Sequence, residues 1–256
     1  IHVPRAPNPK FRGKSECGVR GDTIVEFDWT VGQVLDTLDR LKLAESTLVI
    51  LTSDNGGVLD NNGPDKEHGM GSPEANNGHA FNGVLRGTKG TLWEGGTRLP
   101  FITRWPGHIK RGVSDALVCQ VDMLASFAAL TGQKLAEADA PDSLNVLPAL
   151  LGEKTEKPCR EFLVEQNNGS SPLALRMNHW KFIPGTPGGQ AARRKGAQPE
   201  HPAEAVADRD LPPATGQLFN LATDLSETKD IAAAHPEIVR EMSAKLRDLK
   251  TRGRSR

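Results

Sequence analysis

The sequence has no excess of charge of either sign, few cysteines and no long apolar run. Lys and Arg total 32 and Asp and Glu total 32, so the formal net charge is zero. A neutral chain has no overall field to attract nucleic acid or an anionic membrane, so we expect neither partner and look for local anion sites. No apolar stretch approaches the roughly 18 residues that a membrane-spanning helix needs. The three cysteines (Cys17, Cys119 and Cys159) have unrelated spacings, which indicate neither a disulfide framework nor a Cys-x-x-Cys metal site.

The first half of the chain has an α/β pattern. Apolar residues recur at a helical period over 22–41, which predicts an amphipathic helix with one buried stripe and Asp22 as its N-cap. Residues 47–52 form a short, continuous apolar run, which is typical of a parallel strand buried on both faces. Another short strand ends before Pro106.

The second half has a different pattern. Residues 121–131 read as a helix, and 236–249 as a closing helix with Pro236 in its first turn. Between these helices, short strand-like runs separated by turns predict an antiparallel sheet at 161–166, 173–177, 180–184 and 217–221. We therefore expect an α/β domain over residues 1–155 and a smaller domain over 156–256.

A polar turn, Ser53-Asp54-Asn55-Gly56, follows the first predicted strand. Sites in α/β sheets lie at the carboxyl ends of strands, and Asp and Asn offer the hard oxygen ligands that Ca²⁺ and Mg²⁺ prefer. The same tetrapeptide is also typical of a tight turn whose side chains bind their own backbone. The pattern leaves both interpretations open.

A glycine-rich stretch over 53–98 contains eleven glycines and little periodicity. A connection this long indicates a functional surface. Within it Lys89 is flanked by glycines; the full nucleotide-loop pattern is absent, so Lys89 is either an anion ligand or a solvated lysine. Glu94 and Arg98, four residues apart, predict a structural ion pair that braces the loop.

Taken together, these stretches resemble the type I sulfatases, a family similar to arylsulfatases within the alkaline phosphatase superfamily. The match is carried by HVP at His2, FRGKS, GDTIVEFDWTVGQVLDTLDRL, STLVILTSDNGG, LRGTKGTLWEGGTRLPFITRWPGHI and the weaker LFNLATDLSETKDIAAAHPE. It spans nearly the whole chain and is strongest up to residue 110 or so. The resemblance implies part of an alkaline-phosphatase-like α/β sheet with helices on both faces, followed by a small α+β domain.

The resemblance also implies a role for each matching residue. Asp54 and Asn55 match a pair that completes a Ca²⁺ site, with Mg²⁺ as the other possible ion, and Asp54 would also lie beside the nucleophile. Lys89 would bind the sulfate oxygens, and His2 would hydrogen-bond or protonate the leaving alcohol. His79 and His68, in the glycine-rich stretch, are candidates for contacts to a small-molecule or glycan sulfate ester.

One family feature is absent. The family's nucleophile is a formylglycine made from Cys or Ser in a Cys/Ser-x-Pro-x-Arg motif, and that motif does not occur here. The family's paired N-terminal aspartates, which are further metal ligands, are also missing. We therefore expect an interior piece of a longer chain that is exported (periplasmic, secreted or lysosomal), with the nucleophile upstream of Ile1. Alone, the piece is expected to be inactive, to bind Ca²⁺ poorly and to aggregate.

Two other functions are compatible with the same residues. A phosphate or phosphonate monoester hydrolase of the superfamily would hold its tetrahedral anion with the same lysine and histidine. A relative that binds sulfated glycans without turnover would keep the fold and use the pocket.

Overall fold

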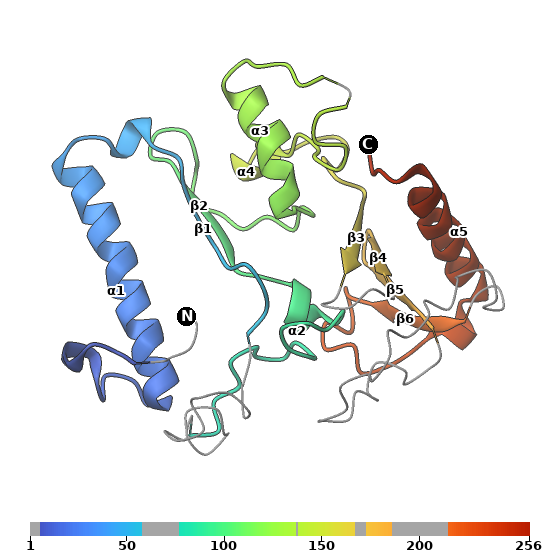
Figure 1. The fold of residues 1–256 in the computed structure, drawn as a ribbon, viewed down its shortest axis with the longest axis horizontal. Helices are drawn as coiled ribbons and strands as arrows, with labels where there is room; N and C mark the ends of the chain where they lie inside the picture. Colours follow the sequence, from blue (N-terminus) through green and yellow to red (C-terminus); the bar gives the residue numbers. More distant parts are fainter. Residues whose placement is uncertain (1–5, 58–76, 137, 167–172, 186–214) are drawn as a thin grey trace, which may run out of the picture. The chain divides into compact units, whose positions relative to one another are not determined.

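The computed structural model describes residues 6–57, 77–136, 138–166, 173–185 and 215–256 (Figure 1). Contacts divide the chain into a first unit, Ile1–Val84 with Leu99–Ile109, and a second unit, Leu85–Arg98 with Lys110–Arg256. This partition differs from the expected domain boundary near residue 155, which stays a prediction. In the part of the chain that is described, no helix is both long and apolar enough to cross a bilayer.

Helix α1 (Gly18–Arg40) belongs to the first unit and begins earlier than the sequence predicts. Asp22 lies inside the helix, so its assignment as the N-cap is wrong. The Asp22 carboxylate accepts hydrogen bonds from the backbone N–H groups of Gly13 and Ser15, both at 2.8 Å. It therefore closes the turn that precedes the helix.

The apolar stripe of α1 is largely exposed, contrary to the expectation of a buried face. Ile24, Phe27 and Val34 keep 42%, 43% and 52% of their surface accessible. The helix contacts the short 3-10 turns η1 (Pro9–Phe11) and η2 (Ala44–Ser46). Helical periodicity shows which face is apolar, but burial requires a neighbouring element across that face.

Strands β1 (Val49–Thr52) and β2 (Phe101–Arg104) form a two-stranded ladder. The ladder is antiparallel, so the parallel arrangement predicted for this strand is wrong for the pair that the structure describes. The β1 residues are also only partly buried. An apolar run favours a strand, but the direction of its neighbour depends on how the chain returns.

The second unit contains a four-stranded sheet in the order β3 (Phe162–Gln166), β4 (Leu173–Met177), β5 (Trp180–Pro184) and β6 (Gly216–Asn220). Every neighbouring pair is antiparallel, which confirms the predicted sheet. Helix α5 (Pro236–Arg252) packs on β4 and β5 and ends at Gly253 in a left-handed conformation (φ 64) (Figure 1). Its buried face consists of Val239, Met242, Leu246 and Leu249, packed against Leu175, Phe182 and Leu218.

The two faces of this sheet differ in chemistry because successive side chains of a strand point to opposite faces. The face away from the α5 core carries three charged residues, Glu165, Arg176 and Lys181. It also carries Ile183 and Phe219, which form a second core cluster with Leu92. The segment around Leu92, which includes the short helix α2 (Glu94–Thr97), therefore packs against a partly charged sheet face.

The remaining elements of the second unit are η4 (Gln120–Asp122), α3 (Met123–Leu130), α4 (Leu147–Leu150) and η5 (Ala232–Ala234). The helix predicted over 121–131 is confirmed by η4 and α3. It is anchored by the buried pair Asp122 and Arg160, in which the guanidinium donates to both carboxylate oxygens.

Candidate functional site

Asp54 and Asn55 lie in the turn directly after β1. Ser53 Oγ donates to the Asn55 carbonyl and Asn55 Nδ2 donates to the Gly56 carbonyl, both at 3.0 Å. The tight-turn interpretation is therefore correct for the side chains of Ser53 and Asn55. Asp54 is exposed, and its carboxylate has no partner among the described residues. Because Asn55 uses its amide nitrogen in the turn, its side-chain oxygen stays an acceptor, and both residues can offer oxygen to a cation.

The side-chain oxygens of Asp54 and Asn55 are the type of ligand that a hard cation prefers, but two residues are fewer than such a cation needs. Ca²⁺ takes six to eight oxygen ligands in general. In the described ranges, no group of three or more His, Cys, Asp and Glu side chains could hold a metal ion. Two side chains can supply only part of such a shell, so the predicted calcium role of Asp54 and Asn55 stays a prediction.

A second turn, residues 77–83, lies against the polar turn. The Gly57 N–H donates to Asn82 Oδ1 at 3.1 Å. A Cβ atom at Gly57 would come within 2.4 Å of the Phe81 ring, so a larger residue here would have to displace the Phe81 side chain. His79 lies in the second turn and is exposed. His2 and His68 lie outside the described residues, so their predicted roles stay predictions.

The Lys89 loop, which runs from Arg86 to Gly95, is closed by its own hydrogen bonds. The Gly95 N–H donates to the Arg86 carbonyl at 2.7 Å. The Thr91 N–H donates to the Thr88 carbonyl at 3.0 Å, and Thr91 Oγ1 accepts from the Thr88 N–H at 3.2 Å. Lys89 is half-buried, and its ammonium has no partner among the described residues. It is therefore available to an anion from outside the loop.

Two glycines of α2 let the helix pack directly on this loop. A Cβ at Gly95 would lie 2.3 Å from the Gly87 carbonyl oxygen, and one at Gly96 would lie 2.3 Å from the Thr91 carbonyl oxygen. Both contacts are with backbone, which cannot swing away. The sequence Glu-Gly-Gly thus lets the end of the Lys89 loop, which carries Glu94, pack tightly against the rest of the loop.

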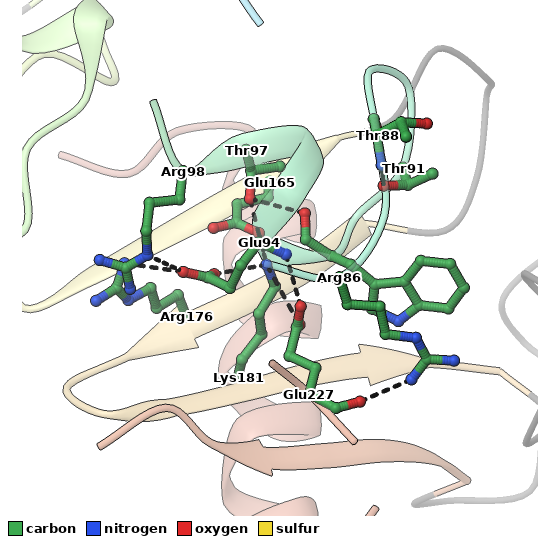
Figure 2. A network of polar contacts seen from close by, with 11 residues as sticks. Arg86, Thr88, Thr91, Glu94, Thr97, Arg98, Glu165, Arg176, Lys181 and Glu227 are labelled. Atoms are coloured by element: carbon green, nitrogen blue, oxygen red, sulfur yellow. Dashed lines mark hydrogen bonds and ion pairs between the residues drawn. The ribbon is translucent and has the colours of Figure 1, made fainter. Parts of the chain in front are cut away.

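Beneath the loop is a buried charge cluster, here called the Lys181 cluster, which consists of Lys181, Glu94, Glu165 and Glu227. The Lys181 Nζ lies 2.9 Å from Glu94 Oε1, 2.8 Å from Glu165 Oε2 and 3.8 Å from Glu227 Oε1 (Figure 2). It also donates to Thr97 Oγ1 at 3.3 Å. The Lys181 side chain is 0% exposed, so these contacts replace its hydration.

Glu94 is shared by three cations. Its pair with Arg98 confirms the ion pair predicted from the sequence. Arg176 Nη1 lies 3.9 Å from Glu94 Oε2 on the same side. Arg176 and Lys181 are directly opposite each other on β4 and β5, and like charges in that relation are unfavourable. The Glu94 carboxylate, which faces both, offsets their repulsion.

Burial and charge shift the pKa values of this cluster in opposite directions. Burial alone would lower the pKa of Lys181, but the carboxylates of Glu165, Glu94 and Glu227 raise it above its ordinary value. Burial likewise raises the pKa of Glu94, but Lys181, Arg98 and Arg176 together hold it below its ordinary value. For Glu227, burial prevails and raises the pKa to about 7, against the lowering effect of Lys181.

The free energy of unfolding should decrease between about pH 5 and pH 7 because of Glu227. Its pKa is about 7 in the folded chain, against an ordinary 4.5, so in this interval the folded state holds a proton that the unfolded state has lost. The lowered pKa values of Glu94 and Asp224 act in the opposite direction, but below this interval. Urea unfolding of wild type and Glu227→Gln should differ in slope by at most about 1.4 kcal/mol per pH unit. Equal slopes would contradict the assignment.

Sequence reasoning missed Lys181, Glu165 and Glu227. Lysine in the otherwise apolar run Trp-Lys-Phe-Ile-Pro was a usable signal, since alternation places it opposite the core face. By itself, however, that signal equally predicts a solvent-facing lysine. Of the predicted site residues, Asp54, Asn55 and His79 lie in the first unit, whereas Lys89 lies in the second.

A family model described as Sulfatase matches residues 3–133. An N-acetylgalactosamine-6-O-sulfatase of Bacteroides thetaiotaomicron is 42% identical over 252 residues, which cover 98% of this chain and 46% of that protein. A steryl-sulfatase of Rattus norvegicus is 36% identical over 261 residues, which cover 96% of this chain and 43% of that protein.

Solved structures are similar over the same length. One from work on the metabolism of multiple glycosaminoglycans by Bacteroides thetaiotaomicron has a TM-score of 0.79 at 39% identity, covering 98% of this chain and 48% of that chain. A sulfatase from Pseudoalteromonas sp. has a TM-score of 0.69 at 26% identity, covering 100% and 48%. This chain spans about half the length of the curated relatives it matches. It has part of the α/β sulfatase fold and belongs to the type I sulfatases of the alkaline phosphatase superfamily.

Proposed function

We propose that this chain supplies the carboxy-terminal part of the catalytic domain of a sulfuric ester hydrolase. The observation that carries the proposal is the Lys89 ammonium, which is held on a closed loop and has no partner among the described residues. The oxygen pair of Asp54 and Asn55 after β1 supports it. So does the matched sulfatase region, residues 3–133, which contains all three side chains.

In the proposed site, Lys89 binds the non-bridging oxygens of the sulfuryl group. A fixed ammonium stabilises the charge on these oxygens most where water is excluded, and therefore contributes to rate as well as binding. His2 holds or donates a proton at the oxygen of the leaving alcohol. His79, which is exposed on the turn beside the metal-binding residues, contacts the substrate outside the sulfuryl group.

Asp54 and Asn55 hold part of a Ca²⁺ site, or of a Mg²⁺ site, and Asp54 also lies beside the nucleophile. When bound, the cation supplies Lewis-acid polarisation of the sulfuryl oxygens. The nucleophile is a formylglycine outside these 256 residues, because their sequence contains no Cys/Ser-x-Pro-x-Arg motif. The 256 residues alone are then inactive and bind Ca²⁺ poorly.

A sulfated sugar is the first substrate to test. The relative at 42% identity is named an N-acetylgalactosamine-6-O-sulfatase, which makes a 6-sulfated amino sugar a better first choice than a steroid sulfate. We further propose that the protein is exported, in keeping with the family resemblance.

The product of the complete gene that encodes this chain should release sulfate from p-nitrophenyl sulfate and from sulfated amino sugars. Asp54→Ala should lower turnover and weaken Ca²⁺ binding, measured by calorimetry, and removal of Ca²⁺ with a chelator should have the same effect on the wild type. Asp36→Ala, at an exposed aspartate of α1, is the matched control and should leave both unchanged.

Three outcomes would contradict the proposal. Turnover of p-nitrophenyl phosphate in place of the sulfate would favour the phosphate or phosphonate hydrolase. Retention of a sulfated oligosaccharide without any turnover would favour the glycan-binding relative. Full activity of Asp54→Ala in the presence of a chelator would remove the metal site from the proposal.

A further inference from the structure

We propose that Glu227 is a positioning residue that fastens both ends of the Lys89 loop and so sets where the Lys89 ammonium meets its anion. This inference rests on the proposed function. It concerns a residue far from Lys89 in the sequence, and it is carried by contacts within the second unit.

Glu227 binds the loop at its start and near its end. Its backbone carbonyl accepts a hydrogen bond from Arg86 Nη1 at 2.7 Å. Its side-chain Oε2 accepts from the backbone N–H of Glu94 at 2.6 Å, across a separation of 133 residues (Figure 2). The two bonds tie opposite ends of the loop to one residue, the start through the Arg86 side chain and the end through the Glu94 backbone.

Glu227 is itself held rigidly. Its φ of 51 places it in the left-handed region, which is uncommon for a residue other than glycine. The Asp224 carbonyl accepts from its backbone N–H at 3.2 Å. The Asp224 carboxylate accepts from the N–H groups of Thr228 at 3.1 Å and Lys229 at 2.8 Å. A turn closed in this way holds a side chain in one place, as a positioning role requires.

Lys181 then ties Glu94 and Glu227 to the sheet. Its Nζ lies 2.9 Å from Glu94 Oε1 and 3.8 Å from Glu227 Oε1, and all of these side chains are buried. A buried charge cluster is weak evidence for stability, because apolar residues of similar volume often stabilise a core as well or better. Its neighbours Leu92, Ile183 and Phe219 are apolar, so this surface already supports apolar packing. The contacts of Lys181 with Glu94 and Glu227 therefore favour a role in positioning the Lys89 loop.

The cluster does not neutralise Lys89, which has no partner among the residues described. The loop is therefore held from beneath while its ammonium stays available. Arg86 adds to this arrangement, since its guanidinium carbon lies 4.0 Å from the centroid of the Trp93 ring, within the same loop. The contacts of Glu227 and Arg86 thus hold the loop backbone, and the Lys89 ammonium stays available to an anion.

The test uses the complete gene product with Glu227→Ala, Glu227→Gln and, as matched control, Glu241→Ala at an exposed glutamate of α5. Glu227→Ala should speed hydrogen exchange at the Thr91 and Gly95 amides about tenfold or more, because the carboxylate that accepts from the Glu94 N–H is lost. It should lower kcat/KM for a sulfate ester by about 10- to 100-fold, as expected for a slightly misplaced binding group. Glu227→Gln keeps an acceptor for the Glu94 N–H and should restore most of the slow exchange in the loop and most of kcat/KM.

A purely structural role predicts a different result. Exchange would then rise across β3 to β6 and α5 as well as in the loop, and kcat/KM would follow the unfolded fraction. That outcome would overturn the inference. Unchanged loop exchange in Glu227→Ala would also overturn it, and so would a failure of Glu227→Gln to restore exchange and kcat/KM. If Glu227→Ala does not fold, Arg86→Met releases the other end and should raise exchange in the loop alone. A wild type without sulfatase activity refutes the proposed function, while the exchange experiment still decides whether Glu227 holds the loop.

Discussion

Lys89→Ala should lower kcat/KM for sulfate ester hydrolysis by about 10²- to 10³-fold and leave the folded state as stable as the wild type. The loss is large because one fixed cation is removed from the oxygens on which charge is stabilised. Stability should not change because Lys89 makes no ion pair with the described residues, and the loop is closed by backbone and threonine hydrogen bonds. Steady-state kinetics with thermal unfolding of the same samples measures both effects.

Two variants sharpen this experiment. Lys110→Ala, at an exposed lysine of the same unit, is the charge-matched control and should keep wild-type kinetics. Lys89→Arg keeps the charge but replaces a compact ammonium with a planar fork, so it should recover activity only in part. Activity of Lys89→Ala within threefold of wild type would show that Lys89 is an ordinary solvated lysine.

Lys181→Met should lower the free energy of unfolding by about 3–5 kcal/mol, the typical cost of removing one partner from a buried ion pair. Methionine replaces most of the aliphatic stem but leaves Glu94, Glu165 and Glu227 without their shared cation. The destabilisation should be largest above pH 7 and should decrease toward pH 5, because protonation of Glu227, whose pKa burial raises to about 7, then relieves part of the unpaired charge. Urea unfolding of the complete gene product at several pH values measures it.

The control for Lys181→Met is Lys154→Met, which removes an exposed lysine of the same unit and should change stability by less than about 0.5 kcal/mol. A second substitution, Glu165→Gln, made together with Lys181→Met should recover part of the loss, because it removes the carboxylate nearest to the missing ammonium. A loss below about 1 kcal/mol for Lys181→Met would mean that the cluster is hydrated and that its charges are screened.

Local patterns identified several elements correctly. The antiparallel sheet followed from short apolar runs broken by turns, and the closing helix from its period and from Pro236. The Glu94–Arg98 pair followed from helical spacing alone. Each of these depends on residues that are close in the chain, so the sequence contains the whole physical cause.

Other features could not be deduced in this way. Asp22 has the chemistry of an N-cap, but its carboxylate accepts hydrogen bonds from an upstream turn instead. The direction of β2 beside β1 was misjudged because an apolar run indicates a strand and says nothing about the strand that returns to it. The α1 stripe is apolar in sequence and exposed in the structure, since burial depends on what lies opposite.

The sequence by itself therefore determined the family, because residue type and order along the chain carry it. It also predicted Lys89 as an anion ligand and Asp54 and Asn55 as cation ligands, and these roles stay predictions. Only the tertiary structure decided that Lys181 is buried and that Glu227 holds the Lys89 loop. On a strand, Lys181 occupies a position that suits water equally well. Its burial depends on a loop more than 80 residues earlier packing over that face and bringing Glu94 to within 2.9 Å of its ammonium.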